Sequence, residues 1–193
     1  MQRRIVLAHA AAVAAAVFAE PATAAGRPAP LPPGYQAMGR RAGVPPLVLY
    51  GVALQESKLL FGPHALPYPW TLCVAGEPRR FANHAAAVAD LRRCVTGGIR
   101  NVDCGSMQVD WAWHADKLGS FERALDPYPN LAVGAFILRS LYGGDWFTAV
   151  GQYHTGPART PEQVARAERY AAAVFARIAT IPRPVARAWG ARA

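Results

Sequence analysis

The sequence predicts a mainly helical domain that carries one small β element. Apolar residues recur at helical spacing through most of the chain between residues 35 and 179. Segments with the composition of a β-hairpin are confined to the region around residues 70–81. Hydrophobic residues make up 52% of the 193 residues, which suits one domain with a sizeable core and excludes a largely disordered chain.

The N-terminus has the composition of a secretory signal peptide. Arg3 and Arg4 precede an apolar, alanine-rich run over residues 5–19, and residues 22–24 match the small-x-small pattern of a cleavage site. We therefore expect residues 1–24 to direct export, and the protein to be periplasmic. The apolar run is shorter than the roughly 20 residues that a membrane span needs, so no stable span is expected. An uncleaved anchor is the alternative.

Proline, glycine and capping residues divide the rest of the chain into segments. Residues 25–34 predict a proline-rich linker, residues 35–157 a mainly helical domain, and residues 158–193 a basic C-terminal helix and tail. The expected helices cover residues 35–42, 46–56, 84–95, 111–118, 131–142, 146–153 and 161–179, and the expected caps include Asn83, Asn130, Asp145 and Thr160. Residues 62–69 predict a loop, residues 70–81 a hairpin, and residues 101–110 an irregular or briefly extended segment.

The chain is strongly basic. Its formal net charge is +9, and 19 of the 21 basic residues are arginine, which favours an anionic partner such as nucleic acid, a membrane surface or an acidic polymer. Export makes nucleic acid the least expected of these and a cell-envelope polymer the most expected. The arginines after Ala158 either form a solvated helix face or attract wall polymer, membrane or a secretion-channel partner.

Three cysteines, Cys73, Cys94 and Cys104, bear on the redox compartment. In an oxidising compartment we expect two of them to pair and one to remain, although the sequence does not choose the pair. The chain has no C-x-x-C motif, so the sequence predicts no metal site and no cofactor.

Glu56 is the first candidate for a catalytic residue. It lies at the end of the apolar helix predicted over residues 46–56, where an exposed pair with Lys58 is the structural alternative. Burial at such a helix end disfavours the charged form and raises the pKa of a carboxyl group. A glutamate of this kind suits protonation of a leaving group at neutral pH.

Four short segments occur in a fixed order along the chain: Glu56-Ser57, Gly105-Ser106-Met107-Gln108, Asn130-Leu131 and Ala149-x-x-x-Tyr153. With these segments the chain resembles the catalytic domain of the soluble lytic transglycosylases (the SLT domain family), which has a goose-type lysozyme-like helical fold. The likeness covers roughly residues 47–157 and implies that residues 35–157 are the catalytic domain. The long spacer that carries the predicted hairpin is similar to the small transglycosylases of conjugation and secretion systems.

The resemblance implies an enzyme, a peptidoglycan lytic transglycosylase. In this family one glutamate, here Glu56, acts first as acid and then as base, and the C6 hydroxyl of N-acetylmuramic acid attacks C1. The β-1,4 bond to N-acetylglucosamine breaks and a 1,6-anhydro end remains, with no metal involved. The implied partners are peptidoglycan glycan strands and a conjugation or secretion apparatus that needs a local opening in the wall.

The resemblance also implies a set of substrate-binding residues. Tyr153 is expected to hydrogen-bond near Glu56 or the sugar, and its alternative is a packed helix tyrosine. Gln108 and the Met107 carbonyl are expected to hold the substrate acetamido group, and their alternative is a simple turn.

Four further positions complete this set. Ser57 either orients the glutamate or caps the end of its helix. Asn130 either binds substrate or caps the next helix. Ser106 occupies the position of the family's usual leucine, and His154 that of its usual asparagine. A histidine there adds a titration near neutral pH.

Other residues leave two rival functions open. Asp103 and Asp110 flank the Gly-Ser-Met-Gln loop, where either is a candidate second carboxylate of a muramidase that uses water, or a residue that structures the loop. Trp70, Trp111 and Trp113 are candidates for sugar stacking or for core packing. The second rival is a wall-binding protein without activity, since two motif positions depart from the family pattern.

Overall fold

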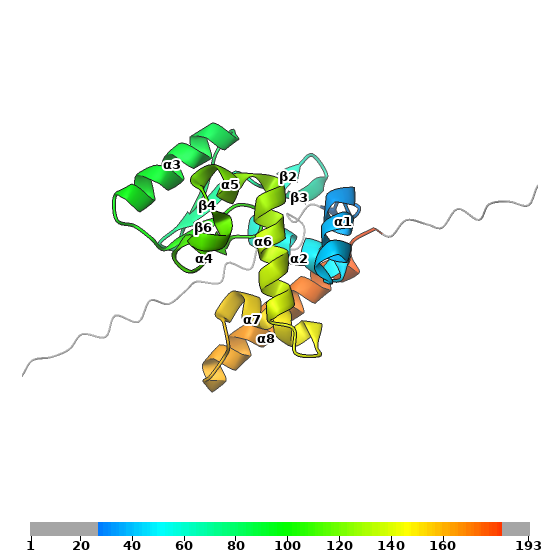
Figure 1. The fold of residues 1–193 in the computed structure, drawn as a ribbon. Coiled ribbons are helices and arrows are strands. Elements are labelled where there is room, and N and C mark those ends of the chain that lie inside the picture. The colour runs from blue at the N-terminus through cyan, green and yellow to red at the C-terminus, as the bar shows by residue number, and fades with distance from the viewer. Residues whose placement is uncertain (1–26, 183–193) are drawn as a thin grey trace, which may run out of the picture.

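The computed structural model describes residues 27–182 (Figure 1). Its helices are α1 (Pro33–Ala42), α2 (Pro46–Ser57), α3 (His84–Thr96), α4 (Trp111–Leu118), α5 (Phe121–Leu125), α6 (Pro127–Ser140), α7 (Trp146–Thr155) and α8 (Pro161–Ala179). The prediction of a mainly helical fold is confirmed. The expected signal peptide over residues 1–24 and the tail over residues 183–193 lie outside the described residues. No helix between residues 27 and 182 is both long and apolar enough to cross a membrane.

Two small sheets accompany the helices. The first has the order β1-β3-β2 and consists of β1 (Arg27–Pro28), β2 (Lys58–Phe61) and β3 (His64–Pro67). The second is antiparallel, has the order β5-β4-β6-β7, and consists of β4 (Thr71–Val74), β5 (Glu77–Arg80), β6 (Val102–Cys104) and β7 (Val109–Asp110). The predicted hairpin over residues 70–81 is confirmed as β4 and β5.

Two segments predicted to be irregular contain strands instead. The expected loop over residues 62–69 contains β3, which pairs with β2 around a turn at Gly62, where φ is +57°. The expected linker over residues 25–34 contains β1, which pairs with β3 in parallel, and the first turn of α1. Prolines are compatible with both places, because they are tolerated in edge strands and at the first position of a helix.

The predicted helix caps are confirmed at Asn83, Asp145 and Thr160. The cap predicted at Asn130 is wrong. Helix α6 begins at Pro127, because Asp126 accepts a hydrogen bond from the backbone N–H of Tyr128 and proline suits the first helical position. Asn130 therefore lies inside the first turn of α6, where its side chain is fully buried.

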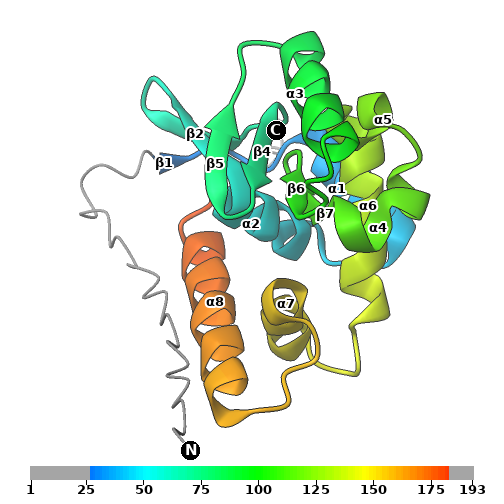
Figure 2. The same ribbon diagram turned by 90° about the vertical axis from the view of Figure 1, so that its left-hand side faces the viewer.

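Helix α2 is at the centre of the core. Seven consecutive residues from Val48 to Leu54 are buried, so α2 is covered on all sides. It contacts α1 and α8, and Figure 2 shows it between the β-sheets and the α7–α8 pair. At the end of the helix Glu56 is partly buried and Ser57 is buried.

Helix α8 packs directly on α2 and α7, so the structure does not separate residues 158–182 from the preceding domain. Ala167, Ala171 and Val174 are buried at helical spacing on the face of α8 that meets these helices. At the far end of the contact, the Arg177 guanidinium donates to Oε1 of Gln55 in α2 at 3.0 Å. The basic C-terminal helix, which the sequence predicts as a segment separate from the preceding domain, therefore packs into the core of that domain.

The contact between α7 and α8 depends on Gly151. A Cβ atom there would lie 2.9 Å from the backbone carbonyl oxygen of Ala167, which cannot move without displacing α8. We expect Gly151→Ala to lower the free energy of unfolding by about 1–3 kcal/mol. Urea denaturation checks this against Gly143→Ala, where an added Cβ meets no atom within 4 Å. Equal stability of the two variants would contradict this role of the contact.

The expected disulfide is absent, because all three cysteines are free thiols. In the β4–β6 pair, Cys104 is opposite Leu72 and Cys73 is opposite Asp103. Neighbouring strand residues point to opposite faces of a sheet, so Cys73 and Cys104 lie on different faces. Cys94 lies on α3, where its sulfur is 3.9 Å from Oδ2 of Asp90.

Candidate active site

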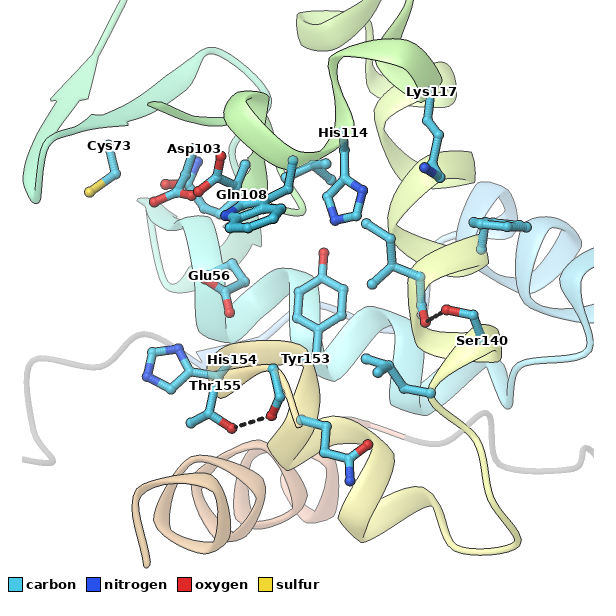
Figure 3. A pocket seen from close by; sticks show the side chains of 18 of the residues that line it. Glu56, Cys73, Asp103, Gln108, His114, Lys117, Ser140, Tyr153, His154 and Thr155 are labelled. Carbon is cyan, nitrogen blue, oxygen red and sulfur yellow. Dashed lines mark hydrogen bonds between the residues drawn. The ribbon is translucent and has the colours of Figure 1, made fainter. Parts of the chain in front are cut away.

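A cleft of about 970 Å³ lies at the C-terminal end of α2 (Figure 3). Its walls come from the four-stranded sheet, α4, α6 and α7. Four of the predicted site residues line it: Glu56, Gln108, Tyr153 and His154. These residues come from three separate parts of the chain and meet in one concave space, which is typical of a ligand site.

Glu56 projects into this cleft from the last turn of α2. Burial raises the pKa of its carboxyl group to about 7. The Tyr170 hydroxyl donates a hydrogen bond to Oε1 and partly opposes this rise, whereas the charge of Asp103 adds to it. Near neutral pH both the acid and the carboxylate are therefore populated, which suits a group that gives up a proton and takes one back.

Tyr170 is a site residue that the sequence analysis does not single out. It lies in α8, three residues after the buried Ala167 and four before the buried Val174, so it is on the face that packs into the domain. The motif resemblance ends before α8, and it implies that Tyr153 forms the hydrogen bond near Glu56. The amphipathic pattern of α8 was the available signal.

Tyr153 has a different hydrogen bond from the one predicted. Its hydroxyl donates to the Met107 carbonyl oxygen at 2.7 Å, between α7 and the loop that joins β6 to β7. The Met107 side chain is fully buried beside Gly134 of α6. Tyr153 therefore lines the cleft and also fixes this loop, while the Met107 carbonyl is engaged within the protein.

Asn130 holds the same loop from behind. Its Nδ2 donates to the carbonyl oxygens of Cys104 at 2.8 Å and Ala124 at 2.9 Å. Its Oδ1 accepts from the backbone N–H of Met107 at 2.9 Å. Every polar atom of this buried amide is satisfied, so Asn130 ties the loop to α5 and α6 and does not reach the cleft.

Ser57 and Ser106 are also part of this support. The Ser57 hydroxyl donates to the Ser106 carbonyl oxygen at 2.9 Å and accepts from the backbone N–H of Tyr68 at 3.2 Å. The Ser106 hydroxyl donates to Oδ1 of Asn130 at 3.3 Å. Both serines are buried behind the cleft, where a leucine at position 106 could not form the bond to Asn130.

Gln108 is the member of the loop that lines the cleft. Its side chain donates to the Gly105 carbonyl oxygen at 2.9 Å. Its φ of +45° is in the left-handed region, which is uncommon for a residue other than glycine. Strain of this kind is concentrated at functional sites.

His154 stacks on the tyrosine that contacts Glu56. The His154 and Tyr170 rings have centroids 4.5 Å apart and are inclined by only 5°. Burial and the charge of Arg166 lower the pKa of His154, so the imidazole is neutral at pH 7. The histidine thus covers one face of Tyr170 at the edge of the cleft.

Of the two aspartates, Asp103 is the stronger candidate for a second functional carboxylate. They face each other across β6 and β7, and both line the cleft. Burial, together with the charge of Asp110, raises the pKa of Asp103 to about 6. Asp110 has a structural task, since its Oδ1 accepts from the backbone N–H of Ala112 and caps α4.

The three tryptophans occupy different environments. Trp111 is buried against Phe121, with ring centroids 4.8 Å apart, and Trp70 is partly buried beside Tyr68. Trp113 lines the cleft and is 79% exposed. Core packing therefore accounts for Trp111 and Trp70, and Trp113 is the one of the three whose ring is open to a ligand in the cleft.

Loss of the Tyr170 hydroxyl has a defined effect on Glu56. A hydrogen bond to a carboxylate favours its charged form, so we expect Tyr170→Phe to raise the pKa of Glu56 above its present value of about 7. An NMR titration of the Glu56 carboxyl carbon measures this shift without reference to any activity. Tyr153→Phe is the matched control, because its hydroxyl bonds to the Met107 carbonyl. Equal effects of the two variants would contradict a specific role for Tyr170.

Within residues 27–182, no three His, Cys, Asp or Glu side chains converge in a way that could bind a metal ion. Comparison of the chain with protein-family models, curated proteins and solved structures finds no match. A functional inference therefore depends on the geometry of the cleft and on the motifs that line or support it.

Proposed function

We propose that this protein is an exported peptidoglycan lytic transglycosylase with a lysozyme-like fold. The observation that carries the proposal is Glu56, a partly buried carboxyl group with a pKa of about 7 at the end of the core helix α2 and on the wall of a large cleft. The motif resemblance supplies the substrate class, the β-1,4-linked glycan of peptidoglycan. From the expected signal peptide we infer a periplasmic location, and from the resemblance we infer local wall opening for a conjugation or secretion apparatus.

The reaction assigns both proton transfers to Glu56. The neutral acid donates its proton to the oxygen that leaves with N-acetylglucosamine, and the C1–O4 bond breaks through an oxocarbenium-like state. The resulting carboxylate then takes the proton of the muramic acid C6 hydroxyl. The C6 oxygen bonds to C1, the 1,6-anhydro ring closes, and Glu56 regains its acid form. Tyr170 holds the carboxyl group by its hydrogen bond during both transfers.

A muramidase is the second candidate, and Asp103 favours it. Asp103 lines the cleft together with Glu56, and its charge contributes to the raised pKa of Glu56. A carboxylate in that place would act as the base that activates water in an inverting hydrolase. The third candidate, a wall-binding protein without activity, rests on the departures at Ser106 and His154.

A digest of purified peptidoglycan sacculi tests the proposal. The chain from residue 25 onward is incubated with sacculi, and the soluble products are identified by mass spectrometry. Anhydro-muropeptides are the expected result. Products with reducing ends would overturn the transglycosylase in favour of the muramidase, and sedimentation of the protein with intact sacculi would leave the wall-binding alternative.

A further inference from the structure

The cleft has a second wall that the proposed chemistry does not use. Helix α4 contributes three residues to it, α6 contributes two, and the C-cap residue of α6 contributes one. We call these residues the α4–α6 wall: Trp113, His114, Lys117, Phe136, Ile137 and Leu141. Figure 3 shows Lys117 on the opposite side of the cleft from Asp103 and Cys73, with His114 between them. A ligand held by Glu56 therefore has room to extend along this wall.

Large aromatic surfaces are exposed on the α4–α6 wall. Trp113 is 79% exposed and Phe136 is 57% exposed, although both line the cleft. Single exposed apolar residues are common, but two aromatic side chains beside Ile137 and Leu141 in one concave space indicate a ligand contact. Rings of this kind pack against apolar groups of a ligand.

The charges along the cleft are uneven. Glu56, Asp103 and Asp110 line one end, whereas Lys117 supplies a positive charge on the α4–α6 wall. The Lys117 ammonium pairs only with its exposed neighbour Asp116, at 3.2 Å, in the part of the chain described here. An anionic group on a ligand is therefore repelled at the aspartate end and attracted toward Lys117.

His114 adds an unused hydrogen-bonding atom to the same wall. Its Nδ1 is buried and has no hydrogen-bond partner among residues 27–182. Its backbone angles, φ −132° and ψ 18°, interrupt α4 and aim the ring into the cleft, as Figure 3 shows. Buried polar atoms normally have a hydrogen-bond partner, so an amide or carboxyl group of a ligand would supply the partner that Nδ1 of His114 lacks among these residues.

We propose that the α4–α6 wall binds the acidic peptide stem of peptidoglycan while Glu56 acts on the glycan that bears it. This inference rests on the proposed function. Such stems are short, contain alanine methyl groups and carry free carboxylates. The methyl groups pack on Trp113 and Phe136, and a carboxylate reaches Lys117. The enzyme consequently prefers glycan strands that retain their stems over strands from which an amidase has removed them.

Cleavage rates on the two kinds of strand test the proposal. We expect wild type to cleave stem-bearing strands faster by about tenfold, which corresponds to 1.4 kcal/mol. Trp113→Ala and Lys117→Gln should lose this preference and keep the wild-type rate on stripped strands. Tyr128→Ala is the matched control, since Tyr128 is 67% exposed but lies outside the cleft. An equal loss on both substrates would mean that Trp113 stacks on sugar, and would overturn the proposal.

Calorimetry with a soluble stem peptide separates this inference from the proposed reaction. Wild type and Glu56→Gln should bind an alanyl-glutamyl-diaminopimelate tripeptide equally, and Trp113→Ala should bind it at least about tenfold more weakly. The peptide site would be overturned if Trp113→Ala bound the tripeptide as tightly as wild type does. It would also be overturned if wild type did not bind the tripeptide. If wild type binds the tripeptide but releases no product from sacculi, the peptide site is supported and the proposed transglycosylase activity is refuted.

Discussion

Replacement of Glu56 by glutamine should abolish the release of anhydro-muropeptides from sacculi. General acid–base catalysis contributes about 10²–10⁴ to a rate, and here one carboxyl group performs both proton transfers, so we expect a loss of at least about 10³-fold. Glutamine keeps the size of the side chain and still accepts the hydrogen bond from Tyr170. Mass spectrometry of the digest measures the loss. A residual rate above a tenth of wild type would assign the acid to another group.

The matched control is Glu122→Gln. Glu122 is an exposed glutamate on α5 whose ion pair with Arg92 lies away from the cleft, so this variant should keep full activity. Asp103→Asn separates the two candidate reactions. If the protein is a transglycosylase, the Asp103→Asn variant should still release anhydro products. If the protein is a muramidase, the variant should release no products with reducing ends.

The pH dependence of activity follows from the same group. The first step needs protonated Glu56, so activity should fall as pH rises through the pKa of about 7. Tyr170→Phe removes a hydrogen bond that favours the carboxylate, and should move this fall to higher pH. A stopped assay over pH 5–9 measures both curves.

Stability should depend on pH in the same sense. The folded pKa of about 7 is above the ordinary value of 4.5 for a glutamate, so the folded protein retains a proton that the unfolded chain releases between these pH values. Wild type should therefore lose stability as pH rises through this window. Glu56→Gln has no proton to lose, and should be more stable than wild type at pH 8 by at most about 3 kcal/mol, with little difference at pH 4. Urea denaturation at the two pH values measures the change in this difference.

Local patterns were sufficient to predict much of the fold and part of the cleft. The apolar run over residues 46–56 predicted a buried helix with a carboxyl group at its end, and α2 with Glu56 confirms it. Asn83, Asp145 and Thr160 marked three helix starts, because capping depends on neighbouring residues only. The β4–β5 hairpin was likewise predictable from its turn.

The missed features depend on contacts between distant segments or on competition between local signals. Tyr170 is 114 residues from Glu56, and only the packing of α8 on α2 brings them together. The start of α6 had two competing caps, Asp126 and Asn130, and the proline after Asp126 favours the one observed. Cys73 and Cys104 do not pair with each other, because strand register, which the sequence leaves open, places them on opposite faces of the sheet.

The largest loss of stability should follow replacement of Asn130. Its amide is fully buried and bonds to the backbone of three residues: Cys104, Ala124 and Met107. Asn130→Ala leaves two carbonyl oxygens and one N–H without this partner in the core. Each unsatisfied buried group costs about 1–3 kcal/mol, so we expect the free energy of unfolding to fall by about 3–5 kcal/mol.

Asn130→Asp distinguishes the hydrogen bonds from the volume of the side chain. Aspartate has nearly the same shape, but it would place a second oxygen against the Cys104 and Ala124 carbonyls, where Nδ2 now donates. It should therefore destabilise the protein at least as much as alanine at pH 7, and less at low pH, where a protonated acid donates one bond. Urea denaturation of both variants at pH 4 and pH 7 checks this order. A stable Asn130→Asp variant at pH 7 would mean that the loop beside Gln108 is held by Ser57 and Tyr153 without the amide.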